Sequence, residues 1–167
     1  MKKTMILVHW LTVILIAMAF LSIEYRNAFG KHSLFHDIMK SSHLYIGYLV
    51  LFITLFRLIA RQFVPVMSLN NYNKSKLRKH ISLFFHMFLY VWLIFIPILG
   101  WCIISAKGSY DIPFGLPAIL NLMPRPNIIA FRDLHNIWAY IGLWIIIIHA
   151  SVALIEYYFI SRKYNPK

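Results

Sequence analysis

Histidine is the residue type whose spacing in this chain most clearly suggests chemistry. His135 and His149 lie fourteen residues apart in an apolar run from Asp133 to Phe159, which is long enough to cross a bilayer as a helix. Fourteen helical residues turn through about 1400°, close to four full turns, and rise about 21 Å. Both imidazoles therefore lie on one face of the predicted helix, one near each side of a membrane. Ionisable groups inside a span indicate a functional site, although a pair of hydrogen-bonded structural histidines is the alternative.

Two further histidines lie in the first two apolar runs. His9 is near the start of the run 5–23, and His43 is near the start of the run 41–60. If the chain crosses the membrane four times, His43 reaches the depth of His135 and His9 that of His149. A four-helix bundle can form sites between side chains of facing helices. The spacing therefore predicts two level pairs, His43 with His135 and His9 with His149.

Such pairs suit haem iron better than zinc. Two neutral imidazoles on opposite sides of a haem leave no open coordination position, which favours electron transfer. Catalytic zinc takes three protein ligands, and no carboxylate or third histidine is obviously level with either pair. Cys102 is the single cysteine, so the chain has no C-x-x-C-H segment for covalent haem attachment. We expect two b haems that are held by coordination and packing alone.

Arg57 and two glycines could complete these sites. Arg57 follows His43 by fourteen residues, so it lies on nearly the same helical face about 21 Å deeper. There its guanidinium could pair with a haem propionate or extend to the lipid headgroups. Gly47 follows His43 by four residues, and Gly142 lies midway between the two histidines of the last run. Each glycine could let a flat macrocycle approach the backbone, or it could bring two helices together.

His86 has no predicted partner. It lies in the third apolar run at about the depth of His9 and His149. It could replace one of them as a ligand, help to bind a quinone headgroup, move protons, or make a structural hydrogen bond. Of the other histidines, we expect His80 at the membrane interface, and His32 and His36 solvated in an external loop.

The composition places these histidines in an integral membrane protein. The 167 residues are 60% hydrophobic and 17% aromatic, with a mean hydropathy of +0.68, which is more apolar than a soluble domain requires. We expect one all-α domain, residues 1–167, with membrane-spanning helices over about 5–23, 41–60, 81–105 and 134–159 forming a four-helix bundle. No P-loop, G-x-G-x-x-G motif or internal repeat occurs in the sequence, which argues against nucleotide chemistry.

The first apolar run also resembles a signal peptide, with Lys2 and Lys3 before it and the small residues Ala17 and Ala19 near its end. Its length of about 19 residues exceeds the usual signal core of about 7 to 15 residues, and a histidine inside such a core is unusual. We therefore expect this run to be retained as a membrane crossing.

Polar segments connect the predicted helices. We expect 24–40 to form an external loop with a short interfacial segment, and 62–79 to form a basic cytoplasmic loop. The longest connection, 106–132, contains four prolines, and we expect a short surface helix over 116–123. Pro97 and Gly100 predict a kink in the third helix.

The basic residues predict an orientation. Lys and Arg outnumber Asp and Glu by 17 to 5, a balance that would suggest nucleic acid for a soluble protein. Positive charge on cytoplasmic loops explains it more simply here, so we expect no nucleic-acid partner. With both termini inside, 11 basic residues lie on the cytoplasmic side and six lie outside. This asymmetry favours an N-in, C-in arrangement in contact with membrane lipid.

The whole pattern resembles the small bacterial cytochrome b561 family, and the related cytochrome b subunits of nickel-iron hydrogenases and formate dehydrogenases. The resemblance covers nearly the whole chain. The residues that carry it are His9-Trp10, Glu24-Tyr25-Arg26, His43 with Gly47 and Arg57, and His135-x6-Gly142-x6-His149.

This resemblance implies a di-haem cytochrome of the bacterial inner membrane that transfers electrons between a periplasmic donor and membrane quinone. The best-known single-subunit activity of the group is superoxide oxidation coupled to ubiquinone reduction, so ubiquinone is the expected acceptor and superoxide a candidate donor. Basic residues of the outer face could attract superoxide, although four acidic residues there offset much of this charge. These basic residues are Arg26, Lys31, Lys40, Arg125 and Arg132.

Two alternative functions remain open at this point. One is a cytochrome b anchor that passes electrons for a separate dehydrogenase or hydrogenase subunit, or for a small periplasmic partner. The other is a haem-free transporter that uses its histidines to move protons or metal ions.

Overall fold

Four long α-helices make up nearly all of the computed structural model, which describes residues 2–29, 33–63, 76–108 and 112–164. The helices are α1 (Lys2–Ala28), α2 (Leu34–Phe63), α3 (Lys76–Lys107) and α4 (Arg125–Tyr164), and a 3-10 turn, η2 (Pro113–Gly115), precedes α4. Each helix is long and apolar enough to cross a membrane. The prediction of an all-α chain with four membrane-spanning helices is confirmed, while the N-in, C-in orientation stays a prediction.

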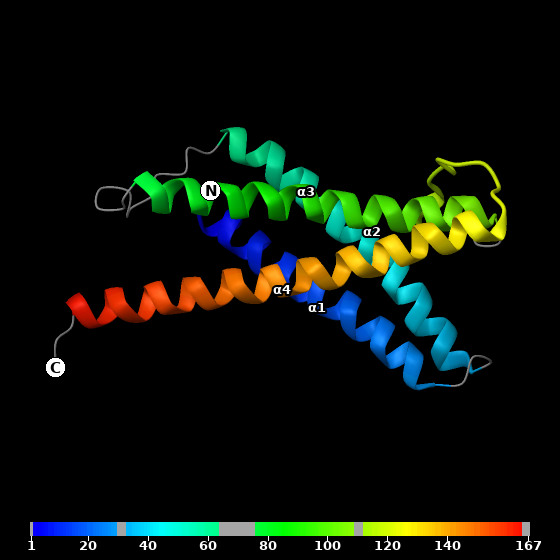
Figure 1. Ribbon diagram of the computed structural model, residues 1–167, viewed down its shortest axis with the longest axis horizontal. Helices are drawn as coiled ribbons and strands as arrows, with labels where there is room; N and C mark the ends of the chain where they lie inside the picture. Colours follow the sequence, from blue (N-terminus) through cyan, green and yellow to red (C-terminus); the bar gives the residue numbers. More distant parts are fainter. Residues whose placement is uncertain (1, 30–32, 64–75, 109–111, 165–167) are drawn as a thin grey trace.

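The helices form two hairpins that cross each other. α1 packs against α2, α3 packs against α4, and α2 and α3 make the contact between the hairpins. Figure 1 shows the α1–α2 pair running obliquely across the α3–α4 pair. The start of α1, the end of α2, the start of α3 and the end of α4 lie toward one end of the long axis (Figure 1). The two described ends of the chain therefore lie on the same side, as four crossings require.

A small apolar core lies where the hairpins meet. Trp92 on α3 belongs to it, and its indole N–H donates a hydrogen bond to the Trp138 carbonyl of α4 at 2.7 Å, which satisfies the only polar group of that ring. Most other large apolar side chains are exposed, as expected for helices that are hydrophobic all round and surrounded by lipid. The core residues are Leu15, Ile46, Val50, Trp92 and Leu93.

Gly142 allows α3 and α4 to approach closely. It is buried, and a Cβ atom added there would overlap the Trp92 indole. The missing side chain therefore makes room for this ring, which is how small residues bring membrane helices together. Of the two roles predicted for Gly142, helix packing is the one that these contacts show.

The helices are longer than predicted, so the connections are shorter. α1 extends to Ala28 and α2 begins at Leu34, which makes most of the predicted external loop 24–40 helical. The Ser33 hydroxyl accepts a hydrogen bond from the His36 N–H at 3.1 Å, as a helix N-cap does. Charged residues mark the end of the apolar span here, but they do not end the helix, because side chains can be solvated while the backbone stays hydrogen-bonded.

α4 likewise begins at Arg125, well before the predicted start at 134. The Pro124 carbonyl accepts hydrogen bonds from the N–H groups of Asn127 at 3.0 Å and Ile128 at 3.4 Å. Pro126 lies in the first turn, where a missing N–H costs no helical hydrogen bond. The prolines that suggested an irregular connection therefore start the helix.

The predicted surface helix over 116–123 is wrong. This segment is irregular, and the helical turn lies earlier, in η2. The Ile119 N–H donates to the Ser105 hydroxyl at 3.2 Å, and the Met123 N–H donates to the Ala106 carbonyl at 3.1 Å. Because these backbone groups bond to the end of α3, they are not available for a helix of their own.

The structure does not decide two other predictions, the kink in α3 and the loop 62–79. α3 continues as a helix through Pro97, and the predicted kink stays a prediction. The predicted cytoplasmic loop 62–79 lies largely outside the described residues, and its two ends are helical.

Candidate functional site

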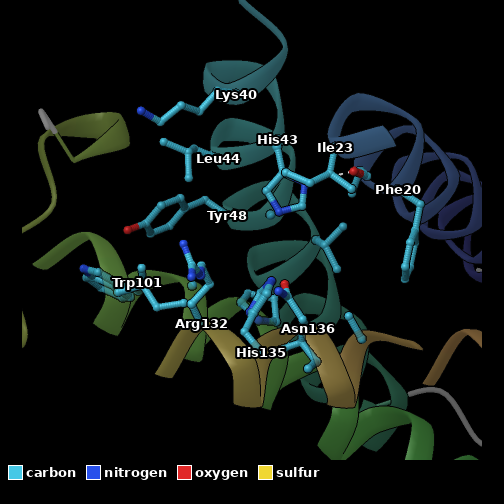
Figure 2. A pocket seen from close by; sticks show the side chains of 18 of the residues that line it. Phe20, Ile23, Lys40, His43, Leu44, Tyr48, Trp101, Arg132, His135 and Asn136 are labelled. Carbon is cyan, nitrogen blue, oxygen red and sulfur yellow. Dashed lines mark hydrogen bonds between the residues drawn. The ribbon is translucent and has the colours of Figure 1, made fainter. Parts of the chain in front are cut away.

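A cavity of about 320 Å³ lies between the helices, with lining residues from all four of them. His43 of α2 and His135 of α4 both lie on its wall, and Figure 2 shows their rings near each other. Ligand pockets in proteins have volumes of about 300–1,000 Å³ and are mostly apolar with a few polar groups. The cavity therefore has the character of a cofactor pocket.

The spacing of His43 and His135 matches two ligands of one metal ion. Their ring centroids are 6.3 Å apart, and the ring planes meet at 80°. Metal–imidazole bonds of about 2.0 Å place two rings on opposite sides of one metal at about 6 Å between centres. The structure thus brings together the first predicted pair at a distance suited to shared coordination.

α1 orients the His43 ring. Nδ1 of His43 lies 2.8 Å from the Ala19 carbonyl, an acceptor that requires this nitrogen to carry the proton. Nε2 is then the unprotonated nitrogen, which is the form that binds a metal. The Ser22 hydroxyl donates to the same carbonyl at 2.8 Å. A backbone carbonyl of one helix therefore sets the tautomer of the candidate ligand on the next.

His135 packs against the backbone of α3. A Cβ atom added at Gly100 would lie 3.6 Å from Cε1 of His135, which is an ordinary van der Waals contact, so the ring packs directly against that helix. Nδ1 of His135 is buried and makes no hydrogen bond of good geometry, although the Ile96 backbone interacts with it weakly. Because Nδ1 faces α3 in this way, Nε2 is the nitrogen that His135 can present to a group bound in the cavity, as in His43.

The cavity also fits a flat macrocycle at Gly47. Gly47 lies on the cavity wall, and a Cβ atom added there would meet nothing within 4 Å. The site thus combines two imidazoles at coordination distance with an open stretch of helix surface. These residues fit a bis-histidine haem. In the part of the chain that the structure describes, Gly142 does not line this cavity.

A second group of histidines lies on α1, α3 and α4. The rings of His86 and His149 are 5.3 Å apart and perpendicular. His9 interacts electrostatically with both of them and with Arg57. The structure therefore places His9, His86 and His149 in one neighbourhood, and the pairing of His9 with His149 stays a prediction. Within the described ranges, no group of three or more His, Cys, Asp or Glu residues is placed to hold one metal ion.

His86 and His149 differ in their surroundings. His86 is exposed, whereas His149 is half-buried. Nδ1 of His86 lies 2.6 Å from the Ser82 carbonyl of its own helix, which leaves Nε2 of His86 without a proton when the ring is neutral. His86 therefore presents a hydrogen-bonding nitrogen at the edge of the group.

Arg57 is half-buried beside this second group. Its Nε is buried and has no hydrogen-bond partner, and its guanidinium lies 5.6 Å from the centre of the Tyr90 ring. Arg61, which we expected to extend to the headgroups, is exposed and lies 5.8 Å from the same ring. A buried guanidinium nitrogen without an acceptor supports the predicted anion partner for Arg57.

The remaining predicted residues are divided between the cavity and the surface. Arg26, Lys40 and Arg132 line the cavity, whereas Arg125 is exposed, and Lys31 and His32 lie outside the described residues. His36 lies 3.3 Å from the Asp37 carboxylate, and His80 is exposed with Nδ1 2.8 Å from the Lys76 carbonyl.

Sequence reasoning missed Gly100 and Tyr48 as lining residues of the cavity. Neither residue has a sequence spacing that relates it to His135, which lies on another helix.

Similarity to known proteins extends over nearly the whole chain. Residues 1–162 match the family described as prokaryotic cytochrome b561. The cytochrome b561 homolog 1 of Escherichia coli (strain K12) is 29% identical over 158 residues, which cover 94% of this chain and 89% of that protein. The probable superoxide oxidase CybB of Yersinia pestis is 27% identical over 157 residues, which cover 90% of this chain and 85% of that protein. Since the family match spans both histidine groups and the greater part of every helix, the chain belongs to the prokaryotic cytochrome b561 family.

Proposed function

We propose that this membrane b-type cytochrome binds two haems and transfers electrons between a donor at the outer face of the bacterial inner membrane and membrane quinone. The observation that carries the proposal is the 6.3 Å spacing of the His43 and His135 rings on the wall of a cavity. A b haem bound there would supply reversible one-electron chemistry at iron. His43 and His135 would hold its iron, with the Ala19 carbonyl keeping His43 in the tautomer that binds a metal.

The second haem belongs to His9 and His149 in this proposal, with Arg57 as the partner of a propionate. Arg57 supports this assignment because its Nε is buried without an acceptor, and a guanidinium binds a carboxylate through paired hydrogen bonds. His86 takes a proton-transfer or quinone-binding role next to this site. Its exposed position on α3 can be reached by a lipid-soluble quinone, whereas an axial ligand needs a more enclosed position.

Superoxide is the donor that we propose, with ubiquinone as acceptor. A relative named as a probable superoxide oxidase supports this choice. Arg26, Lys40 and Arg132 line the cavity between His43 and His135, and positive charge around a cleft raises the encounter rate with a small anion. Glu24 also lines the cavity and reduces this effect.

Visible difference spectra test the haem assignments. We expect the reduced-minus-oxidised spectrum of the purified protein to show b-type bands for two haems. His43→Ala and His135→Ala should each lose the first haem, and His9→Ala and His149→Ala the second. His36→Ala is the matched control, because this histidine lies on the same helix as His43 but interacts with Asp37 outside the cavity.

Three outcomes of that series would change the proposal. Retention of both haems in any of the four ligand variants would remove that residue from the ligand set. Loss of one haem in His86→Ala would require a new pairing at the second site. The absence of b-type bands from the unaltered protein would reject the haem proposal and favour a haem-free transporter.

Stopped-flow kinetics test the donor and the acceptor. Superoxide should disappear faster in the presence of the protein than by spontaneous dismutation, with ubiquinone reduced in parallel. No acceleration would reject superoxide as the donor. Co-purification of a large redox subunit would then favour the role of an electron-transfer anchor.

A further inference from the structure

Tyr48 on α2 has a buried hydroxyl group with no hydrogen-bond partner. The residue is 4% exposed, and its phenolic oxygen is buried and makes no hydrogen bond. Buried tyrosine hydroxyls ordinarily find a partner, because leaving one unsatisfied forfeits its hydrogen bond to water. A hydroxyl in this position therefore points to a ligand that the protein itself does not provide.

The aromatic neighbours of Tyr48 cannot supply that partner. Its ring makes edge contacts with Trp101 at 5.4 Å and Phe114 at 6.4 Å, measured between ring centroids. The Trp101 indole N–H is a donor only, and it is already bonded to the Pro117 carbonyl at 3.1 Å. These contacts fix the ring of Tyr48 but leave its hydroxyl free to donate.

Tyr48 lies on the wall of the cavity that contains His43 and His135. Figure 2 shows Tyr48 and Arg132 on one side of the two histidines, with Phe20 and Ile23 on the other side. Arg132 lines the same cavity and is 4.0 Å from Asp133 through its Nε atom. One end of the cavity thus combines a neutral hydroxyl donor with a guanidinium group, while apolar side chains lie opposite.

Two other polar residues of the cavity wall, Tyr140 and Arg26, have hydrogen-bond partners within the protein. Tyr140 of α4 donates its hydroxyl hydrogen bond to Oε1 of Glu24 at 2.9 Å, so its phenol is satisfied where that of Tyr48 is not. Arg26 of α1 donates through Nη2 to Asn27 at 3.0 Å, although its Nε is buried without a partner. Tyr48 and Arg132 are therefore the better candidates for binding an anion, and Arg26 is the alternative.

We propose that Tyr48 and Arg132 form an oxyanion site at this end of the cavity, which binds a carboxylate or a similarly small anion through the Tyr48 hydroxyl and the Arg132 guanidinium. Hydrogen bonds from a guanidinium to a carboxylate are charge-assisted, and an added neutral donor fixes the position of one oxygen. This inference rests on the proposed haem at His43 and His135. The anion is either a propionate of that haem or a free small anion that enters from the outer face.

The test compares Tyr48→Phe with Tyr45→Phe. Phenylalanine keeps the ring contacts at position 48 and removes only the hydroxyl. Tyr45 is the matched control because it lies on the same helix and contacts the same Phe114 ring at 5.3 Å, yet it is 48% exposed and does not line this cavity. The measurements are redox-induced infrared difference spectra and midpoint potentials of purified protein whose haem is labelled with ¹³C at the propionate carboxyls.

Two results would support the site and identify the source of the anion. A shifted propionate band and a lower midpoint potential in Tyr48→Phe, but not in Tyr45→Phe, would identify the haem propionate. The potential falls because an unneutralised carboxylate favours the more positively charged oxidised state. An unchanged band, together with a formate affinity at least several-fold weaker in Tyr48→Phe than in the unaltered protein, would identify a free anion.

Identical behaviour of the two tyrosine variants in bands, potentials and formate binding would overturn the proposal. A band shift caused by Arg26→Gln but not by Tyr48→Phe would also overturn it, because the anion would then be bound by Arg26 instead. Every measurement uses protein that shows b-type bands. Missing haem therefore counts against the proposed function, whereas an unchanged Tyr48→Phe spectrum counts against this site alone.

Discussion

At the scale of single residues, the neighbours of the histidines decide what the imidazoles can do. His43 has its tautomer set by a carbonyl on another helix, 2.8 Å away, while Nδ1 of His135 faces the backbone of α3 beside Gly100 and Ile96. At the second site, His86 and Arg57 lie beside His9 and His149. Arg57 gives the clearest test, because its charge is fixed and its surroundings differ from those of Arg61.

We predict that Arg57→Gln lowers the midpoint potential of the second haem. A positive charge near the haem disfavours its oxidised form, so removing that charge makes oxidation easier. The expected shift is on the order of tens of mV, since about 59 mV corresponds to about 1.4 kcal/mol for a one-electron couple. Potentiometric titration followed by visible spectroscopy measures it in purified protein.

Arg61→Gln is the control for this measurement. It removes the same charge from above the same Tyr90 ring, but from an exposed side chain. Solvent screens exposed charges, so this variant should shift the potential less. Equal shifts in the two variants would contradict a propionate partner for Arg57.

At the scale of helices, the contact between α3 and α4 depends on one glycine and one tryptophan. The Trp92 ring occupies the space that a side chain at Gly142 would need, and its N–H bonds to the Trp138 carbonyl. This contact positions His135 and His149, which lie on either side of Gly142 along α4. Helix packing at Gly142 therefore supports both histidine groups without contacting a ligand.

We predict that Gly142→Ala destabilises the protein by about 1–3 kcal/mol, the usual cost of overpacking a well-filled site. The higher helix propensity of alanine offsets at most about 1 kcal/mol of this cost. Ser151→Ala is the control on the same helix, because Ser151 is exposed and its hydroxyl bonds to the Ile147 carbonyl of α4 itself. Thermal unfolding in detergent, followed by circular dichroism, should show a midpoint several degrees lower for Gly142→Ala only. Equal midpoints would show that Trp92 can move aside at little cost.

At the scale of the whole molecule, two crossing hairpins create the cavity. The described ends of the chain lie on the same side (Figure 1), which agrees with four crossings. The direction of insertion follows from the distribution of Lys and Arg. It decides whether the cavity with Arg132 and Lys40 faces the outer side of the membrane, where a superoxide donor would reach it.

We predict that the chain is inserted with both termini in the cytoplasm. In a Cys102→Ser background, a cysteine at Asn127 should react with a membrane-impermeant maleimide in intact cells, because this residue is exposed near the start of α4. A cysteine at Lys3 of α1, which is also exposed, should react only after the membrane is permeabilised. The reverse pattern would place the His43–His135 cavity on the cytoplasmic side and reject an outer-face donor.

The sequence by itself determined the four spans and predicted the pairing of the histidines. A run of about 20 apolar residues has few stable states other than a membrane helix, and helical geometry fixes the relative depth of residues along one span. His43 and His135 could therefore be matched without coordinates. The helix ends could not, because Ser33 and Pro124 start helices through local hydrogen bonds that the hydropathy pattern does not register.

Only the tertiary structure decided which residues surround each pair. Gly100 and Tyr48 reach the cavity because α3 and α2 cross at a particular angle and rotation, and side chains from different helices have no sequence spacing in common. The same packing placed the ring centroids of His86 and His149 5.3 Å apart and the Trp92 ring against Gly142. Interhelical geometry depends on many small packing contacts, so the residues that surround each pair could not be predicted from the sequence pattern.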